Sequence, residues 1–254
     1  MSKLFVFSLI QASPRRLGNL FDNLVRGRGI SFSLGTLHKP STNFSRELQK
    51  TLDSESNFRK IEKLFKYLRQ HRKWYRENDL VDPHYFNYLL LDPRVTNGLR
   101  QRARSIHQMD VWLTFLKAIF YVGKGKASRP YVHLKKAQKF LNETHSITLA
   151  KDPKLALIVS IWRAERGILL LRAFRGISSK DAQTREAAII DALGMNHLTN
   201  RRLGAYCSGP ARSEFTRREQ RYLGIALLYK LMLKFLASEE REIYPLQNKA
   251  AMAA

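Results

Sequence analysis

Residues 118–133, AIFYVGKGKASRPYVH, carry the residue types that bind a phosphate group: two glycines, two lysines and an arginine behind an apolar run. Glycines let a ligand approach the backbone closely, and the free N–H groups at a helix start attract anions. The spacing matches neither a P-loop nor the dinucleotide fingerprint, whose third glycine is replaced by Ser128. The stretch therefore suits a phosphodiester, and no nucleotide cofactor is expected. Lys124 and Lys126 are its candidate DNA contacts.

A carboxylate that could bind a metal ion follows later in the chain. Glu186 lies at the helical spacing i, i+3, i+4, i+7 with three apolar residues, Ile189, Ile190 and Leu193. This spacing places the carboxylate on the core-facing side of a helix, where it needs a cation or a hydrogen-bond network. One carboxylate, completed by phosphate oxygens and waters, is a common way to hold Mg²⁺. The alternative is a structural salt bridge to Arg185 or Arg129.

Three further polar residues could stabilise charge or move a proton. Arg129 is expected at a helix start, where the dipole disfavours a cation, so a bound anion is indicated there. In phosphodiester hydrolysis it would stabilise the pentacovalent transition state. His133, one turn later, could shuttle a proton or bind phosphate, or be structural. Asn200 could fix Glu186 or a substrate oxygen, or hold a turn.

Two tyrosines, Tyr88 and Tyr121, lie in expected strands, where the default role is core packing. The functional alternative is that one of them orients or deprotonates the attacking water. A phenol with its usual pKa of about 10 is a poor base at neutral pH. Lys124 and Lys126, or a metal ion, would therefore have to lower that pKa.

Alternating strands and helices must position these residues. Apolar and aromatic runs predict strands at 85–91, 119–123 and 168–174. Helical periodicity predicts helices over 54–80, 99–117, 128–142, 153–164, 178–194 and 217–240. Ser128 and Ser178 are the expected N-caps of two of these helices, and Gly167 is expected to close the helix that starts at Pro153.

The chain divides into four parts by composition. Residues 1–53 show no sustained period and are expected to be disordered, and 54–80 form the basic amphipathic helix. A main domain spans 81–240, and 241–254 form a tail. Residues 1–40 carry six Lys/Arg and only Asp22 as an acid, which suits a mitochondrial presequence or, the favoured interpretation, an ordinary basic tail.

The charge balance points to a polyanion. The 45 Lys and Arg residues against 21 Asp and Glu give a net charge of +24, which favours nucleic acid over an acidic membrane. The single Cys207 excludes an intramolecular disulfide and a multi-cysteine zinc site. No apolar stretch reaches the ~18 residues of a membrane span. Further phosphate contacts, without base reading, are expected from Lys135, Lys136, Arg201 and Arg202.

Two tripeptides, Tyr88-Leu89-Leu90 and Tyr121-Val122-Gly123, resemble the signatures of the GIY-YIG endonuclease family. The residues that resemble the family's remaining motif positions, in order, are Arg129, His133, Glu186 and Asn200. Over about 80–240 the chain resembles most the ankyrin-repeat and LEM-domain endonucleases of animals, with phrases such as YLLLDPR and TREA. It departs from most GIY-YIG enzymes in the long insertion between the tyrosines, and ankyrin and LEM segments are not recognised.

The resemblance implies an α/β (α+β) fold: a small three-stranded, mainly antiparallel sheet flanked by helices, with a helical insertion and a basic helical N-terminal extension. It implies one Mg²⁺ or Mn²⁺ ion at Glu186, with catalytic roles for Tyr88, Tyr121, Arg129, His133 and Asn200. The implied activity is hydrolysis of branched or structured DNA in repair or chromosome processing, leaving 5′-phosphate and 3′-hydroxyl ends. The nucleus or cytoplasm is the expected location. The alternatives are a non-catalytic nucleic-acid-binding module and a basic organellar RNA-binding protein.

Overall fold

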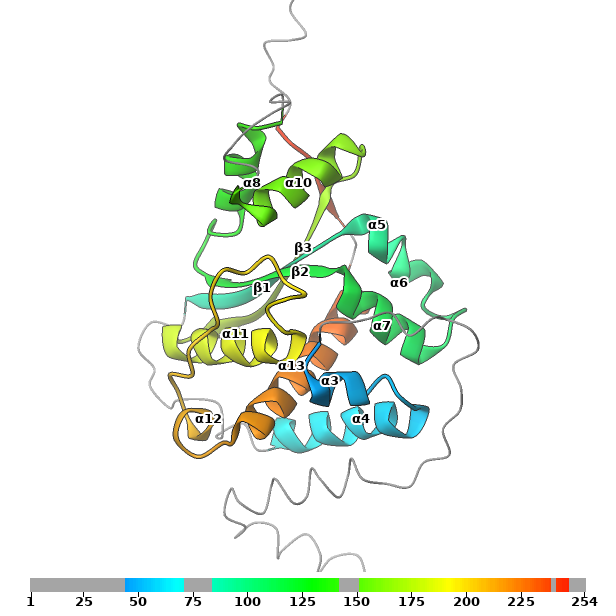
Figure 1. Cartoon of the computed structure of the whole chain (residues 1–254), viewed down its shortest axis with the longest axis vertical. Coiled ribbons are helices and arrows are strands. Elements are labelled where there is room, and N and C mark those ends of the chain that lie inside the picture. Colours follow the sequence, from blue (N-terminus) through cyan, green and yellow to red (C-terminus); the bar gives the residue numbers. More distant parts are fainter. Residues whose placement is uncertain (1–43, 71–83, 142–150, 239–240, 247–254) are drawn as a thin grey trace, which may run out of the picture.

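One antiparallel sheet organises the computed structural model, which describes residues 44–70, 84–141, 151–238 and 241–246 (Figure 1). Its order is β2-β1-β3-β4, where the strands are β1 (Tyr85–Leu91), β2 (Ile119–Gly125), β3 (Ile168–Ile177) and β4 (Glu242–Ile243). The three predicted strands are confirmed. The prediction of a three-stranded sheet is wrong, because β4 adds a fourth strand. The sequence did not indicate β4, because it is too short to show alternation and lies in the segment assigned to the tail.

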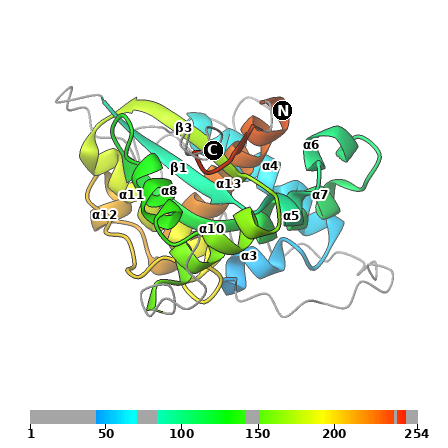
Figure 2. The same ribbon diagram turned by 90° about the horizontal axis from the view of Figure 1, so that it is seen from above.

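Helices cover both faces of this sheet (Figure 1). One face carries α11 (Ser179–Leu193) and α13 (Arg217–Ala237), and the other carries α8 (Tyr131–Gln138) and α10 (Pro153–Arg163). Seen from above, α8 and α10 overlie β1 (Figure 2).

The alternation of β1 separates two apolar cores. Leu89 and Leu91 belong to the larger core, which includes residues of α11 and α13. Tyr88 and Leu90 point to the opposite face and belong to a smaller core, which includes residues of α8 and α10. This alternation directs the first signature tyrosine toward α8.

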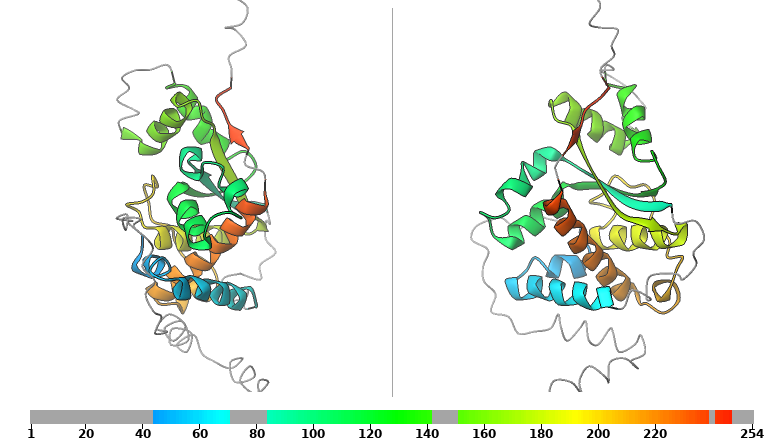
Figure 3. Two further views of the ribbon diagram at one scale, coloured as in Figure 1. Left: turned by 90° about the vertical axis from the view of Figure 1, so that its right-hand side faces the viewer. Right: turned by 180° about the vertical axis from the view of Figure 1, so that it is seen from behind.

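The N-terminal helices α3 (Arg46–Lys50) and α4 (Glu55–Gln70) pack against α13 (Figure 3). Leu48 is fully buried, and the Ser45 N–H donates to the carbonyl of Ala192 at 3.1 Å. The prediction of disorder is therefore wrong for residues 44–53, which are part of the folded domain. Residues 1–43, and the last part of the helix predicted over 54–80, lie outside the described residues.

Three helices fill the insertion between β1 and β2 instead of the single one predicted over 99–117. They are α5 (Pro93–Thr96), α6 (Leu99–Arg102) and α7 (Gln108–Ala118). Asn97 and Gly98 separate the first two because both adopt left-handed backbone angles, with φ of 43° and 65°. A new start at α7 is capped by His107, whose Nδ1 accepts from the Met109 N–H at 3.3 Å.

Two predicted capping residues, Gly167 after α10 and Ser128 before α8, are wrong. The helix α10 ends at Arg163, and Glu165, not Gly167, adopts the left-handed conformation after it, with φ of 57°. Gly167 is required for another reason, because a Cβ there would lie 2.7 Å from the Cβ of Glu242 on β4. Ser128 does not cap α8, which starts at Tyr131 after a turn.

The starts of the two long helices agree with the sequence. Ser178 caps α11 by accepting from the Asp181 N–H at 3.1 Å. Thr216 and Glu219 form a capping box at the start of α13, just after the short helix α12 (Pro210–Ser213). Among the helices of the described ranges, none is both long and apolar enough to cross a bilayer.

Candidate active site

The two signature tyrosines lie on the α8 side of the sheet, with ring centroids 6.0 Å apart. In the register of the two strands Tyr88 pairs with Gly123 and Leu90 pairs with Tyr121. A Cβ at Gly123 would lie within 2.6 Å of the Tyr88 hydroxyl oxygen and even closer to Cζ. The glycine of the second tripeptide is therefore required for the Tyr88 ring to lie across β2.

The helix α8 brings His133 to these tyrosines. Buried Leu134 and Ala137 hold the helix against the sheet. Nε2 of His133 then lies 3.0 Å from the Tyr88 hydroxyl, within hydrogen-bond distance, and its ring centroid is 5.0 Å from that of Tyr121.

Burial decides the protonation of this cluster. It raises the pKa of the Tyr88 hydroxyl above its usual range, with further contributions from Tyr121 and Glu186. Burial and the charge of Glu186 also raise the pKa of Tyr121. Burial, with the positive charges of Lys154 and Arg129, lowers the pKa of His133 to about 4. At pH 7 both phenols are therefore protonated and the imidazole is neutral.

The predicted effect of the loop lysines on the tyrosines is consequently wrong. Lys124 turns to α11, where its Nζ donates to Oε1 of Gln183 at 2.8 Å. Lys126 Nζ lies 4.6 Å from the ring centroid of Tyr85. Neither ammonium group offsets the rise that burial causes in the pKa of Tyr88 and Tyr121.

Glu186 lies half-buried at the edge of the apolar face of α11. Its Oε1 accepts a hydrogen bond from the backbone N–H of Lys124, on β2, at 3.1 Å. Burial raises its pKa to about 7, against the opposing charge of Lys124. Within the described ranges Glu186 forms no ion pair, so the alternative of a salt bridge to Arg129 or Arg185 is not found.

Asn200 holds a loop against the free edge of β2. Its Nδ2 donates to the Val122 carbonyl at 2.8 Å, and its Oδ1 accepts the Val122 N–H at 3.0 Å. Thr199 continues the pairing through its N–H, which donates to the Phe120 carbonyl at 2.8 Å. Asn200 therefore does not contact Glu186, as one of its predicted roles required, and instead fixes the loop beside it.

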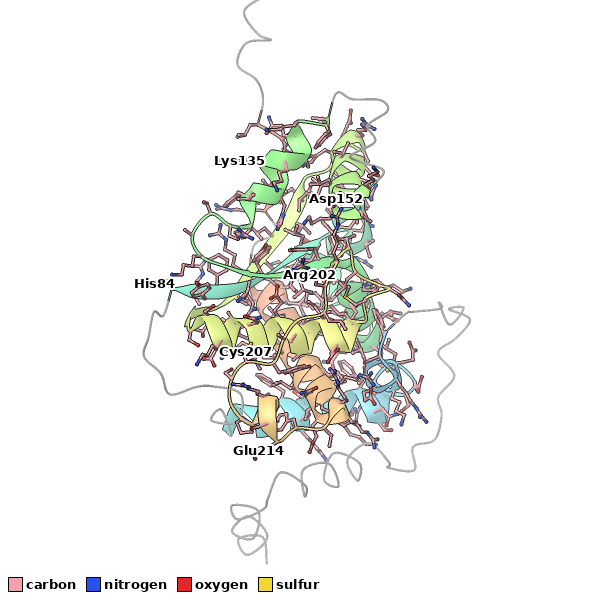
Figure 4. The ribbon with its side chains drawn as sticks, turned by 60° about the vertical axis from the view of Figure 1, so that its left-hand side comes forward. His84, Lys135, Asp152, Arg202, Cys207 and Glu214 are labelled. Atoms are coloured by element: carbon pink, nitrogen blue, oxygen red, sulfur yellow. The ribbon has the colours of Figure 1, made fainter. Side chains whose placement is uncertain are left out.

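A cavity of about 420 Å³ opens between α10, β2, α11 and this loop. Its lining includes Tyr121, Glu186, Asn200 and Lys154. Figure 4 shows Asp152 at the start of α10 and Arg202 on the loop that follows α11. The loop is tied to α10 by Arg201, whose Nη2 donates to the Lys151 carbonyl at 2.6 Å and lies 3.4 Å from Oδ2 of Asp152.

The remaining predicted residues lie before and on α8 and on the loop after α11. Arg129 is exposed in the turn before α8, where its Cβ packs against Gly125. Lys135 and Lys136 are exposed on α8, and Arg201 and Arg202 are exposed on the loop.

Sequence reasoning missed Lys154, which enters the cavity from α10. Its Nζ lies 4.5 Å from the ring centroid of Tyr121, and burial lowers its pKa. A cation directly after the Asp152-Pro153 helix start was the available signal, because a helix N-terminus disfavours positive charge.

Comparison with known proteins matches this arrangement to a family. The family model described as the LEM-3-like GIY-YIG domain covers residues 85–250, a range that includes the whole cavity. Ankyrin repeat and LEM domain-containing protein 1 of Homo sapiens is 41% identical over 160 residues, which are 63% of this chain and 26% of that protein. The Mus musculus protein is 42% identical over 160 residues, which are 63% and 29% of the two chains.

The Caenorhabditis elegans homolog of that protein is 31% identical over 121 residues, which are 48% of this chain and 16% of the homolog. The chain thus spans less than a third of the length of each of these relatives. No solved structure gives a significant match. The family match across most of the chain shows that it belongs to the GIY-YIG endonuclease family, in its LEM-3-like branch.

Proposed function

We propose that this protein is a metal-dependent endonuclease that hydrolyses phosphodiester bonds in branched or structured DNA. The observation that carries the proposal is the half-buried carboxylate of Glu186, which forms no ion pair within the described ranges. It lines a polar cavity beside Tyr121, in the domain of a nuclease family.

The residues present fit one hard divalent ion, Mg²⁺ or Mn²⁺. Oε1 of Glu186 accepts one N–H, and Oε2 has no hydrogen-bond partner among the described residues. Those residues contain no cluster of three or more His, Cys, Asp and Glu, so the fit is to a single-carboxylate site completed by phosphate oxygens and water. When bound, such an ion would polarise the phosphodiester and acidify water.

The protein's own groups would supply proton transfer and charge stabilisation. Neutral His133 would accept a proton from the attacking water, while the protonated hydroxyls of Tyr88 and Tyr121 orient that water. The bond between phosphorus and the 3′-oxygen breaks as the new phosphorus–oxygen bond forms, and the 3′-oxygen takes a proton from solvent water, leaving a 5′-phosphate and a 3′-hydroxyl. Arg129, exposed beside this cluster, would stabilise the negative charge on phosphorus oxygens.

Substrate binding is assigned to exposed basic residues of α8 and of the loop after α11. Lys135, Lys136 and Arg202 are exposed, and the chain has a net charge of +24. Contacts of this kind bind phosphates and carry no base sequence information. The preference for branched DNA, in repair or chromosome processing, rests on the resemblance to the animal endonucleases of this family.

The test compares wild type with Glu186→Gln and Arg129→Ala on supercoiled plasmid and on a branched oligonucleotide, with Mg²⁺ or with EDTA. Wild type is expected to cut only with Mg²⁺, and both variants to bind DNA but cut at least about 100-fold more slowly. Glu214→Gln is the matched control, because Glu214 is exposed and distant from the cavity lining. Binding by all proteins with cutting by none would make this a non-catalytic nucleic-acid-binding module.

We also propose that the protein acts in the nucleus or cytoplasm, and the acid-poor N-terminus makes the mitochondrion the alternative. A fluorescent fusion of residues 1–40 separates the two. Mitochondrial import of the fusion would overturn the proposed location.

A further inference from the structure

Lys154 is a cation in the cavity that no motif of the family accounts for here. It is half-buried near the start of α10, and its ammonium group lies 4.5 Å from the centroid of the Tyr121 ring. The same cavity is lined by Glu186 and Asn200. A cation over an aromatic face is held in position while its free donors remain available to a ligand.

The surroundings do not neutralise this ammonium group. The nearby carboxylate, Asp152, caps α10 by accepting the Leu155 N–H at 3.3 Å and lies 3.4 Å from Nη2 of Arg201. No ion pair involves Lys154 within the part of the chain that the structure describes. The start of a helix also disfavours a cation. A half-buried positive charge in such a place is best explained by an anion that binds in the cavity.

We propose that Lys154 binds a phosphate oxygen of the nucleic-acid backbone in this cavity, and so forms a phosphate subsite together with the catalytic groups around Glu186. The inference rests on the proposed function for its ligand, a phosphodiester. Lys154 Nζ donates to a non-bridging oxygen and stabilises the negative charge that grows there as the attacking oxygen bonds to phosphorus. The Tyr121 ring and the loop tied to α10 keep the ammonium group in place.

A purely structural role would be to cover the Tyr121 ring, and three variants separate the two roles. Lys154→Met keeps the length of the side chain and removes its charge. Lys154→Arg keeps the charge. Lys234→Met is the control, because Lys234 is exposed on α13 and does not line the cavity.

Two quantities are measured for each variant: the single-turnover cleavage rate constant with Mg²⁺, and the salt dependence of DNA binding by anisotropy with Ca²⁺ in its place. Lys154→Met is expected to slow cleavage about 100-fold, as loss of one charge-stabilising donor does. It should also reduce the slope of log K against log salt by about 0.9, the loss of one phosphate contact in duplex DNA. Lys154→Arg should retain the slope.

Unchanged cleavage and slope in Lys154→Met, with only a lower melting temperature, would overturn the proposal and leave the structural role. If wild type does not cut at all, the proposed enzymatic function fails. In that case the salt slope alone decides on Lys154, and a slope reduced by about 0.9 still supports a phosphate contact, whereas an equal slope overturns it.

Discussion

Replacing Glu186 by glutamine should stabilise the metal-free protein at alkaline pH. Burial raises the pKa of this carboxyl from 4.5 to about 7, so the folded state holds its proton more tightly than the unfolded state. This stability contribution is present in full below pH 4.5 and is lost as the pH rises through about 7. The shift corresponds to about 3 kcal/mol. Glutamine keeps the shape and carries no charge to bury.

Thermal unfolding of wild type and Glu186→Gln in EDTA, at pH 4.5 and at pH 8, measures this difference. At pH 8 the variant should melt about 6–12 °C above wild type, since about 1 kcal/mol shifts a domain of this size by ~2–4 °C. At pH 4.5 the two should melt together. Mg²⁺ at pH 8 should then raise the melting temperature of wild type alone, because only wild type offers a carboxylate.

Lower stability of Glu186→Gln than of wild type at pH 8 would contradict an unpaired buried carboxylate, since Glu186 would then have a stabilising partner. A difference of the same size at both pH values would also contradict it, because the difference would not come from ionisation. Glu214→Gln, at an exposed carboxylate, should stay within about 0.5 kcal/mol of wild type at both pH values.

Three further substitutions test contacts at the site and in the core of the domain. Gly123→Ala should lower the free energy of unfolding by about 1–3 kcal/mol in chemical denaturation, and by less in a Tyr88→Leu background, where the clashing ring is gone; additive losses would contradict the contact. Leu48→Ala should lower it by about 2–5 kcal/mol, and a change below about 0.5 kcal/mol would contradict the packing of α3. Asn200→Asp replaces the donor to the Val122 carbonyl by an acceptor, so stability at pH 8 should fall by about 1–3 kcal/mol, and equal stability would disprove the edge pairing.

Local patterns in the sequence predicted the strands that carry the two tyrosines and the helix that carries Glu186. Each has strong local signals: a run of aromatic and apolar residues in β1, and a capping serine before α11. The short helix α3 lacks a sustained apolar period, and it is held by contacts with residues distant in the sequence. Arg221 Nη1, for example, lies 3.0 Å from Oε2 of Glu47. Sequence reasoning therefore assigned that segment to disorder.

The chemistry of the site depended on neighbours that spacing does not reveal. The tyrosines become weaker acids because they are buried, and the lysines expected to counteract this contact Gln183 and Tyr85 instead. Lys154 meets Tyr121 only because α10 crosses the face of the sheet opposite α11. Side-chain direction at these positions follows from the tertiary packing.

The most direct test of a metal-dependent catalytic centre at Glu186 is the single-turnover rate constant for cleavage of a branched DNA, measured against Mg²⁺ concentration for wild type and Glu186→Gln. The wild-type rate constant is expected to rise with Mg²⁺ to a plateau, and that of the variant to stay at least about 100-fold below it. Cleavage by wild type that is independent of Mg²⁺, or equal cleavage by the variant, would contradict a catalytic centre built on Glu186.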